Sequence, residues 1–261
     1  MNEVFSKNAF HDKHIIISGG AGDIGMEIAN AFAKAGAKRI ALLDIDARGM
    51  SEAANKLKKI GCTSVIECEV DLADENEIKE AINKLYHEYT DWNVLATTAG
   101  LFVGGPLTEI KGDDWDRLMA VNARAVFLLS RLVAEKMMIL GQGKIIHIGS
   151  SATYFGTPRN GAYAASKVVI NQLTQTMAVE WGPHNIQVNT ICPTVAETKF
   201  LNYVSGDISH KKLRETLKDK MPLKRLLLPS DIAPLVLFLA SDSAQFINGA
   251  IIPIDGGTRL T

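Results

Sequence analysis

Short apolar runs alternate with longer segments of helical periodicity along most of the chain. The first run, residues 14–18, is mainly isoleucine and ends at a pair of glycines. It predicts a buried strand, because isoleucine is β-branched and the run is too short for a helix. In residues 23–36, apolar side chains recur at helical spacing from Ile24 to Phe32, and Gly36 stands where a helix C-cap is expected.

The same alternation continues through the rest of the sequence. Further strands are expected at 39–43, 64–70, 93–97, 144–148, 187–191 and 250–254. Further helices are expected at 50–60, 75–89, 115–140, 162–181 and 230–240. Several of the strands are continuous Ile/Val/Leu runs, which is typical of a parallel sheet covered by helices on both faces. No linker or repeat interrupts the pattern, so the sequence predicts one doubly wound α/β domain over residues 1–261.

One region breaks the alternation. Residues 196–220 contain Gly206, Asp207 and several other charged residues, and they follow a predicted strand. Ligands of doubly wound sheets lie outside the carboxyl ends of the strands, so an insertion at this place fits a substrate lid. An ordinary surface excursion explains the same pattern, and the sequence leaves both interpretations open.

Composition and charge argue against several classes of protein. The formal net charge is −1, which gives no reason to expect nucleic acid or an acidic membrane as partner. The three cysteines have no CxxC spacing, so neither a disulfide framework nor a zinc site is indicated, and we expect no metal. The N-terminal residues lack the apolar core of a signal peptide, and no apolar run approaches the roughly 20 residues that span a bilayer. We therefore expect a cytoplasmic protein.

A glycine-rich turn follows the first predicted strand. Residues 20–25 read Gly-Ala-Gly-Asp-Ile-Gly and open the first predicted helix, which is the context that a dinucleotide-binding motif requires. Glycines let the backbone approach a pyrophosphate, whose charge meets the positive end of the helix dipole. A purely structural strand–helix turn is the alternative.

Asp44 ends the second predicted strand, 19 residues after Gly25. An acidic residue about 20 residues after the motif hydrogen-bonds a ribose hydroxyl and would repel the 2′-phosphate of NADP. No Lys or Arg lies within residues 42–46, so the sequence favours NAD. The alternative is that Asp44 only caps the next helix.

Tyr163 and Lys167 are four residues apart on a predicted helix and share one face. A free tyrosine titrates near pH ~10, and a neighbouring ammonium is expected to lower its pKa. Ser150 lies just after the predicted strand 144–148, at the sheet edge where a cofactor would bind. This combination predicts an acid/base group beside a bound cofactor.

With these residues in place, the sequence resembles the short-chain dehydrogenase/reductase family over residues 13–257. The matching segments are 18–25, Val70-Asp71-Leu72, Ala99-Gly100, Val121-Asn122, 148–151, 163–167, 188–193 and 254–257. The resemblance implies a single-domain Rossmann-type doubly wound parallel sheet, a secondary alcohol or ketone substrate and a homotetramer.

The resemblance also implies roles for four catalytic residues. Tyr163 would be the general acid/base on the substrate oxygen, and Ser150 would hydrogen-bond that oxygen. Lys167 would hold the nicotinamide ribose and depress the tyrosine pKa. Asn122 would hold a water that links Lys167 to solvent, although it could also satisfy backbone groups within its own helix.

Cofactor contacts are implied in the same way. Asp71 would contact the adenine ring, unless it is only a helix cap, and Thr198 would contact the nicotinamide carboxamide. The full set expected at the cofactor is Gly19, Gly22, Asp23, Ile24, Gly25, Asp44, Asp71, Leu72, Ala99, Gly100, Tyr163, Lys167 and Thr198.

Three positions depart from the family pattern. Asp23 stands where the family has the second of three glycines, and it would place a carboxylate close to a pyrophosphate unless it points away. Thr97-Thr98 replaces an Asn-Asn pair, which removes an amide that supports the fourth strand. Pro193-Thr194 replaces Pro-Gly.

The main functional expectation is an NAD-dependent dehydrogenase acting on a polyol, sugar or hydroxy acid. A catalytically retired NAD-binding sensor is an alternative, and the intact set of four catalytic residues argues against it. An NADPH-dependent ketoacyl-type reductase is another, and Asp44 argues against that. Arg159, Asn160 and Lys199 either meet a polar or anionic substrate or are ordinary loop residues.

An oligomer is expected partly from the two long helices, which carry many apolar side chains. These side chains serve either a second copy or the core of the monomer. They are Val126, Leu129, Val133, Met137, Val169, Leu173 and Met177.

Overall fold

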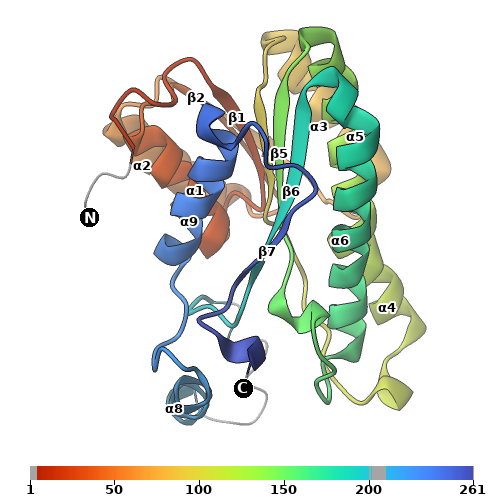
Figure 1. Cartoon of the computed structure of the whole chain (residues 1–261). Helices are drawn as coiled ribbons and strands as arrows, with labels where there is room; N and C mark the ends of the chain where they lie inside the picture. The colour runs from red at the N-terminus through yellow and green to blue at the C-terminus, as the bar shows by residue number, and fades with distance from the viewer. Residues whose placement is uncertain (1–4, 200, 202–209, 261) are drawn as a thin grey trace.

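A computed structural model describes residues 5–199, 201 and 210–260. Its centre is a seven-stranded sheet in the order β3-β2-β1-β4-β5-β6-β7, and every neighbouring pair is parallel (Figure 1). The strands are β1 (His14–Ser18), β2 (Arg39–Asp44), β3 (Ser64–Glu69), β4 (Val94–Thr97), β5 (Gly143–Ile148), β6 (Ile186–Pro193) and β7 (Ile251–Ile254). The strand order reverses between β1 and β4, which in a doubly wound sheet is where ligands bind.

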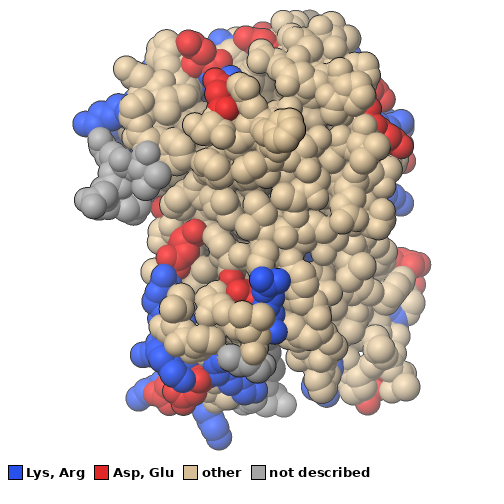
Figure 2. All heavy atoms as spheres, viewed as in Figure 1, with Lys and Arg blue, Asp and Glu red and all other residues tan. Residues whose placement is uncertain are grey.

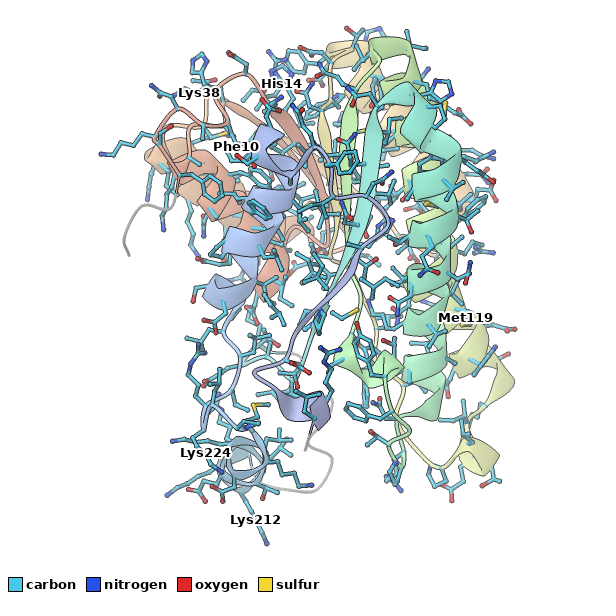
Figure 3. All side chains as sticks on the ribbon, viewed as in Figure 1. Phe10, His14, Lys38, Met119, Lys212 and Lys224 are labelled. Atoms are coloured by element: carbon cyan, nitrogen blue, oxygen red, sulfur yellow. The ribbon has the colours of Figure 1, made fainter. Side chains whose placement is uncertain are left out.

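Helices cover both faces of the sheet, as the alternation predicts. One layer holds α1 (Asp23–Lys34), α2 (Ala47–Ile60) and α9 (Pro229–Ala240). The other holds α3 (Glu75–Glu88), α5 (Ala125–Leu140) and α6 (Gly161–Trp181). Side chains fill both spaces between sheet and helices (Figure 3). Phe10 packs edge-on against Phe32, with ring centroids 5.0 Å apart. None of the described helices is long and apolar enough to cross a membrane.

The helix expected at 115–140 has three parts. It begins as α4 (Gly112–Met119), continues through the π-helical turn η2 (Ala120–Arg124) and ends as α5. A π turn holds one residue more than an α turn and changes which side chains face inward. Apolar periodicity continues on both sides of it, so the sequence pattern gives one uninterrupted helix.

The segment expected to be irregular, 196–220, is partly helical. Residues 210–220 form α8 (His210–Lys220), which lies below the sheet in Figure 1. The apolar positions of α8 pack with the start of the segment and with the link to α9, in a small cluster made of Leu201, Met221 and Leu226 with Val195, Leu213 and Leu217. Residues 200 and 202–209 of the expected lid, with Gly206 and Asp207, lie outside the described residues.

Of the two roles left open for the apolar residues of the long helices, most of these residues take the second and fill the core of the monomer. Val126, Leu129, Val133, Met137 and Met177 are at most 4% exposed. Leu173 packs against the same core. Other apolar side chains of the two helices are exposed, namely Phe127, Ile139, Val168 and Val179.

Strand β7 forms one edge of the sheet and contains a proline. The Thr190 and Thr194 N–H groups donate to the carbonyls of Ala250 and Ile254, at 2.8 and 3.1 Å. The even-numbered residues of this strand therefore face β6, and the backbone of Pro253 faces the open edge.

Candidate active site

The glycine-rich turn leaves no room for side chains. Gly19 has φ +74°, and a methyl group there would lie 2.6 Å from the Ala99 nitrogen. A methyl group on Gly25 would overlap the Gly19 carbonyl oxygen. Gly22 is the N-cap of α1 and has no side chain to accept the N–H groups of the first helical turn, to which Asp23, Ile24 and Gly25 belong. This close backbone with uncapped amides fits a pyrophosphate.

Asp44 lies beside this turn. Its carboxylate accepts the N–H of Ala21 and the N–H of Asp46, both at 3.0 Å. The N-cap of α2 is Asp46, whose side chain accepts the Gly49 N–H at 2.9 Å. Asp44 therefore does not cap the helix, which removes the alternative role, and it places a carboxylate at the rim of the turn.

The remaining expected cofactor residues lie on the next two loops. Asp71 accepts the N–H of Ala73 and forms a 2.9 Å ion pair with Arg117, and this guanidinium and the backbone hydrogen bond lower the pKa of Asp71. Leu72 is buried in the α3–α5 layer. Ala99 and Gly100 follow β4, opposite the glycine turn.

Three catalytic candidates meet at the carboxyl end of β5. The Ser150 and Tyr163 side chains hydrogen-bond each other, and the ring of Phe102 packs on the tyrosine with centroids 5.4 Å apart. Lys167 is buried, donates to the Ile148 carbonyl at 3.0 Å and lies 6.0 Å from the centroid of the Tyr163 ring. The spacing of Tyr163 and Lys167 in the sequence therefore corresponds to a shared face of α6.

The pKa of the tyrosine differs from expectation. The sequence predicts a value below 10, whereas burial raises the pKa of Tyr163 to about 12, although the hydrogen bond to Ser150 opposes the rise. Burial also lowers the pKa of Lys167 to about 8. The cause is shared: both groups are buried where charge is poorly solvated, and this is the largest influence on each pKa.

Asn122 lies in the π turn, fully buried, and braces the loop after β4. Its Oδ1 accepts the Leu101 N–H at 2.8 Å, and its Nδ2 donates to the Leu101 carbonyl and to Ser166 Oγ, both at 3.0 Å. The backbone that it satisfies thus belongs to a distant loop and not to its own helix. A methyl group on Gly100 would lie 3.5 Å from Lys167 Nζ and 3.6 Å from Asn122 Oδ1, so both side chains lie beside that glycine.

Comparison with known proteins gives the same assignment. A family model described as enoyl-(acyl carrier protein) reductase matches residues 19–259. The chain belongs to the short-chain dehydrogenase/reductase family. Members of this family of oxidoreductases use a nicotinamide cofactor.

Relatives in this family match nearly the whole chain. An NAD-dependent glycerol dehydrogenase of Listeria innocua is 32% identical over 95% of this chain and 94% of its own length. A D-threitol dehydrogenase of Mycolicibacterium smegmatis is 34% identical over 95% and 93%. A gluconate 5-dehydrogenase from Burkholderia cenocepacia, solved in complex with NADP and tartrate, superposes with a TM-score of 0.89 at 28% identity and covers 97% of this chain and 98% of that one.

Two departures from the short-chain dehydrogenase/reductase pattern are compensated. The Thr98 hydroxyl donates to the Ser18 carbonyl at 2.7 Å, and Thr97 Oγ1 bonds His147 Nδ1 at 2.9 Å, so hydroxyls support the fourth strand. Asp23 points away from the turn, as expected, because its carboxylate accepts the Lys199 N–H at 2.6 Å. That bond ties the start of the substrate segment to the first turn of α1.

Three expected substrate or cofactor contacts lie at the rim. Thr198 directly precedes this tie and, with Lys199, lines an open cleft of about 600 Å³ beside Asp23. Arg159 is exposed, has φ +64° and accepts the Gly105 N–H through its carbonyl.

Sequence reasoning missed several buried polar groups around the site. His147 is fully buried on β5 beside Lys167, and burial lowers its pKa to about 3. Cys192 on β6 accepts a hydrogen bond from the Tyr154 hydroxyl and faces Lys167. A histidine or cysteine alone in an apolar run carries no signal for these partners, since each contact joins residues far apart in sequence.

Proposed function

We propose that this protein is an NAD-dependent oxidoreductase that interconverts a secondary alcohol and the corresponding ketone. The observation that carries the proposal is the Ser150–Tyr163 hydrogen bond with the buried Lys167 behind it. A bound nicotinamide would accept or donate the hydride at this place.

The residues of the chain would handle the proton and align the substrate. Ser150 and Tyr163 present two adjacent hydroxyls, so one substrate oxygen can bond to both. Tyr163 takes the alcohol proton during oxidation and returns it during reduction, while Ser150 stabilises the charge that develops on the oxygen. Lys167 stabilises the phenolate, and because the two groups interact, a pH profile of turnover reports the pair.

The cofactor preference rests on Asp44. Its carboxylate is fixed at the rim of the glycine turn by two N–H groups and would hydrogen-bond a ribose diol. Arg48, the nearest basic residue in the sequence, forms a 3.4 Å ion pair with Glu52. This supports NAD over NADP.

The relatives support polyols, sugars and related acids as the substrate class. They include dehydrogenases named for glycerol, threitol and gluconate, all compounds with adjacent hydroxyl groups. We further propose a homotetramer, supported by the exposed apolar side chains of α5 and α6. Light scattering that gave a mass near 28.3 kDa at micromolar concentration would overturn the oligomer.

The decisive experiment is turnover of an alcohol panel with NAD and NADP, together with the variant Tyr163→Phe. Reduced nicotinamide is followed by its absorbance. Tyr163→Phe should lower kcat by about 10²–10⁴-fold and leave NAD binding within twofold, because the phenyl ring keeps its packing while the proton acceptor is lost. A variant that kept most of its activity on a good substrate would exclude this mechanism.

A further inference from the structure

The segment after β6 is rich in basic residues. Residues 196–225 contain eight of the 28 Lys and Arg residues and four of the 29 Asp and Glu residues, so they carry a net charge of +4 while the rest carries −5. Figure 2 shows the blue side chains gathered around α8, and Lys212 points away from the body of the molecule (Figure 3). A field of this sign attracts anions toward the neighbouring opening.

This segment adjoins the residues that follow β7. A methyl group on Gly256 would touch Leu223 at 3.3 Å, and one on Gly257 would touch Pro222 at 3.5 Å. The short helix η6 (Thr258–Leu260) is thereby held between the basic segment and the catalytic loop. Arg259 lies on it.

Arg259 is anchored on one side and exposed on the other. Its Nε lies 3.6 Å from Asp255 Oδ2, and its side chain is 38% exposed. The Asp255 carboxylate is buried and also accepts the N–H groups of Gly257 and Arg259, at 3.0 and 3.1 Å. Within the described residues, no hydrogen bond is recorded for the two terminal nitrogens of the guanidinium. Those nitrogens are the pair that binds carboxylates in a forked geometry.

The ring of Tyr154 connects Arg259 with the loop that carries Ser150. The guanidinium carbon lies 5.3 Å from the centroid of Tyr154, whose hydroxyl donates to Cys192. A methyl group on Gly149, the residue before Ser150, would lie 3.0 Å from Cys192 Sγ. The ring therefore spans from the guanidinium to the base of the Ser150 loop.

Among the described residues, several other cations of this region are engaged or lie on the cofactor side. Arg214 pairs with Glu197 at 3.2 Å, and Arg225 bonds both oxygens of Asp231. Lys199 lies on the Asp23 side, with the cofactor residues. Within the part of the chain that the structure describes, Arg259 lies against Tyr154, and its terminal nitrogens suit a substrate carboxylate.

We infer that the substrate is a hydroxy acid, or the keto acid formed from it, whose carboxylate is bound by Arg259 while its secondary hydroxyl reaches Ser150 and Tyr163. The inference rests on the proposed function and narrows its substrate class. The basic segment concentrates such anions at the opening, and Arg259 fixes the distance between the carboxylate and the carbon that reacts.

Matched compounds test the inference by binding. Tartrate is compared with threitol, and gluconate with glucitol, because within each pair only carboxylate and hydroxymethyl groups are exchanged. Affinities are measured by calorimetry with NADH present, so no oxidation takes place. The wild type should bind each acid about tenfold or more tightly than its neutral partner, as a charge-assisted hydrogen bond is worth about 1.5–3 kcal/mol.

Three variants distinguish direct binding of the carboxylate by Arg259 from the general electrostatic attraction of the basic segment. Arg259→Gln should remove the preference for acids and change the affinity for the polyols less than twofold. Arg259→Lys, which keeps the charge and loses the fork, should fall between. Lys218→Gln removes the same charge from the exposed surface of α8 and should change acid binding less than twofold. Thermal unfolding of each variant shows whether η6 remains folded.

The outcomes distinguish this inference from the proposed function. Equal binding of acids and polyols, or an unchanged preference in Arg259→Gln, overturns the role of Arg259. Equal losses in Arg259→Gln and Lys218→Gln overturn it too, because the general field would then be the cause. If no compound is oxidised with NAD or NADP, the proposed function fails, whatever the binding shows.

Discussion

The glycine turn and the segment after β6 both lie at carboxyl ends of strands, yet they keep their shape by different means. The turn is held by backbone against backbone: the Gly19 and Gly22 N–H groups donate to the carbonyls of Leu43 and Gly19, at 2.8 and 3.1 Å. The segment depends more on side chains, through the Arg214–Glu197 ion pair and a small apolar cluster, although the Glu197 N–H also donates to the Leu227 carbonyl at 2.7 Å. Close backbone contacts in the turn leave no space for a larger side chain, whereas the side chains of the segment could be replaced by others that pack equally well. The turn is therefore suited to a fixed ligand such as a cofactor, and the segment to ligands that differ from protein to protein.

Disrupting the backbone contact should have the largest effect. In Gly25→Ala the added methyl group overlaps the Gly19 carbonyl oxygen, so the turn has to open. We expect a loss of about 1–3 kcal/mol of unfolding free energy, the usual range for overpacking, together with loss of NAD binding. Urea unfolding and calorimetry measure the two.

Gly112→Ala is the matched control for this change. Gly112 opens α4, and nothing lies within 4 Å of the added methyl group. Its stability should stay the same or rise by about 0.5–1 kcal/mol. If both alanine variants behaved alike, close backbone contact would not be what holds the turn.

The sheet beneath the site should respond to acid. Burial holds the pKa of His147 at about 3 in the folded protein, against 6.5 for a free imidazole. The unfolded chain therefore binds an extra proton between pH 6.5 and 3, and the stability that the neutral imidazole provides is lost as the pH falls through this window.

His147→Asn removes this titration and keeps a polar partner for Thr97. Between pH 7 and pH 4.5 the wild type should lose more unfolding free energy than the variant, by an amount on the order of 2 kcal/mol. Urea unfolding at both pH values gives the difference, and carboxylates common to both proteins cancel. Parallel losses in the two proteins would mean that His147 is accessible to protons in the native state.

At the rim of the turn, Asp44 should decide between the two cofactors. Asp44→Ala removes the ribose acceptor and the charge that opposes a 2′-phosphate. The ratio of kcat/KM for NAD to that for NADP should fall about tenfold or more, mainly through weaker NAD, as expected for about 1.5–3 kcal/mol. Asp46→Ala, which loses only the cap of α2, should keep the ratio and lose about 1 kcal/mol of stability.

The smallest effect is expected at the hydrogen bond between Asp23 and Lys199, which joins the two regions. Asp23→Gly deletes the acceptor of the Lys199 N–H and frees the segment that carries Thr198. KM for NAD should rise about fivefold, since one hydrogen bond to a charged group is lost while repulsion from the pyrophosphate is also relieved. Asp23→Asn, which can still accept the bond, should stay within twofold of the wild type. A lower KM in Asp23→Gly would show that repulsion outweighs the tie.

Local signals explain why much of the architecture is predictable. The strands, the main helices, the glycine turn and the Tyr163–Lys167 pair all depend on periodicity or spacing within a few residues. The π turn is invisible to such signals, because one extra residue does not interrupt the apolar pattern. Helix α8 is mostly charged and its sequence indicates a solvated helix face, but Leu213 and Leu217 alone do not indicate what the helix packs against.

Contacts between distant segments explain what the sequence does not reveal. Thr97 and His147 are 50 residues apart, and Asp23 and Lys199 are 176 apart. The pKa of Tyr163 also depends on burial, which only the assembled sheet and helices create. The same limit applies to the apolar residues of α5 and α6, since their spacing alone does not tell which face meets the sheet.

Pro253 limits how copies of this chain can join at the β7 edge. Of the four residues of the strand, only Ile251 and Pro253 direct their backbones outward, and proline has no N–H to offer. A strand from another molecule would therefore find a single donor along this edge, too few for a regular ladder. Copies that meet at this edge have to do so through side chains, so the sheet does not continue from one subunit into the next. Pro253 thereby opposes the repeated addition of strands that leads to fibrils.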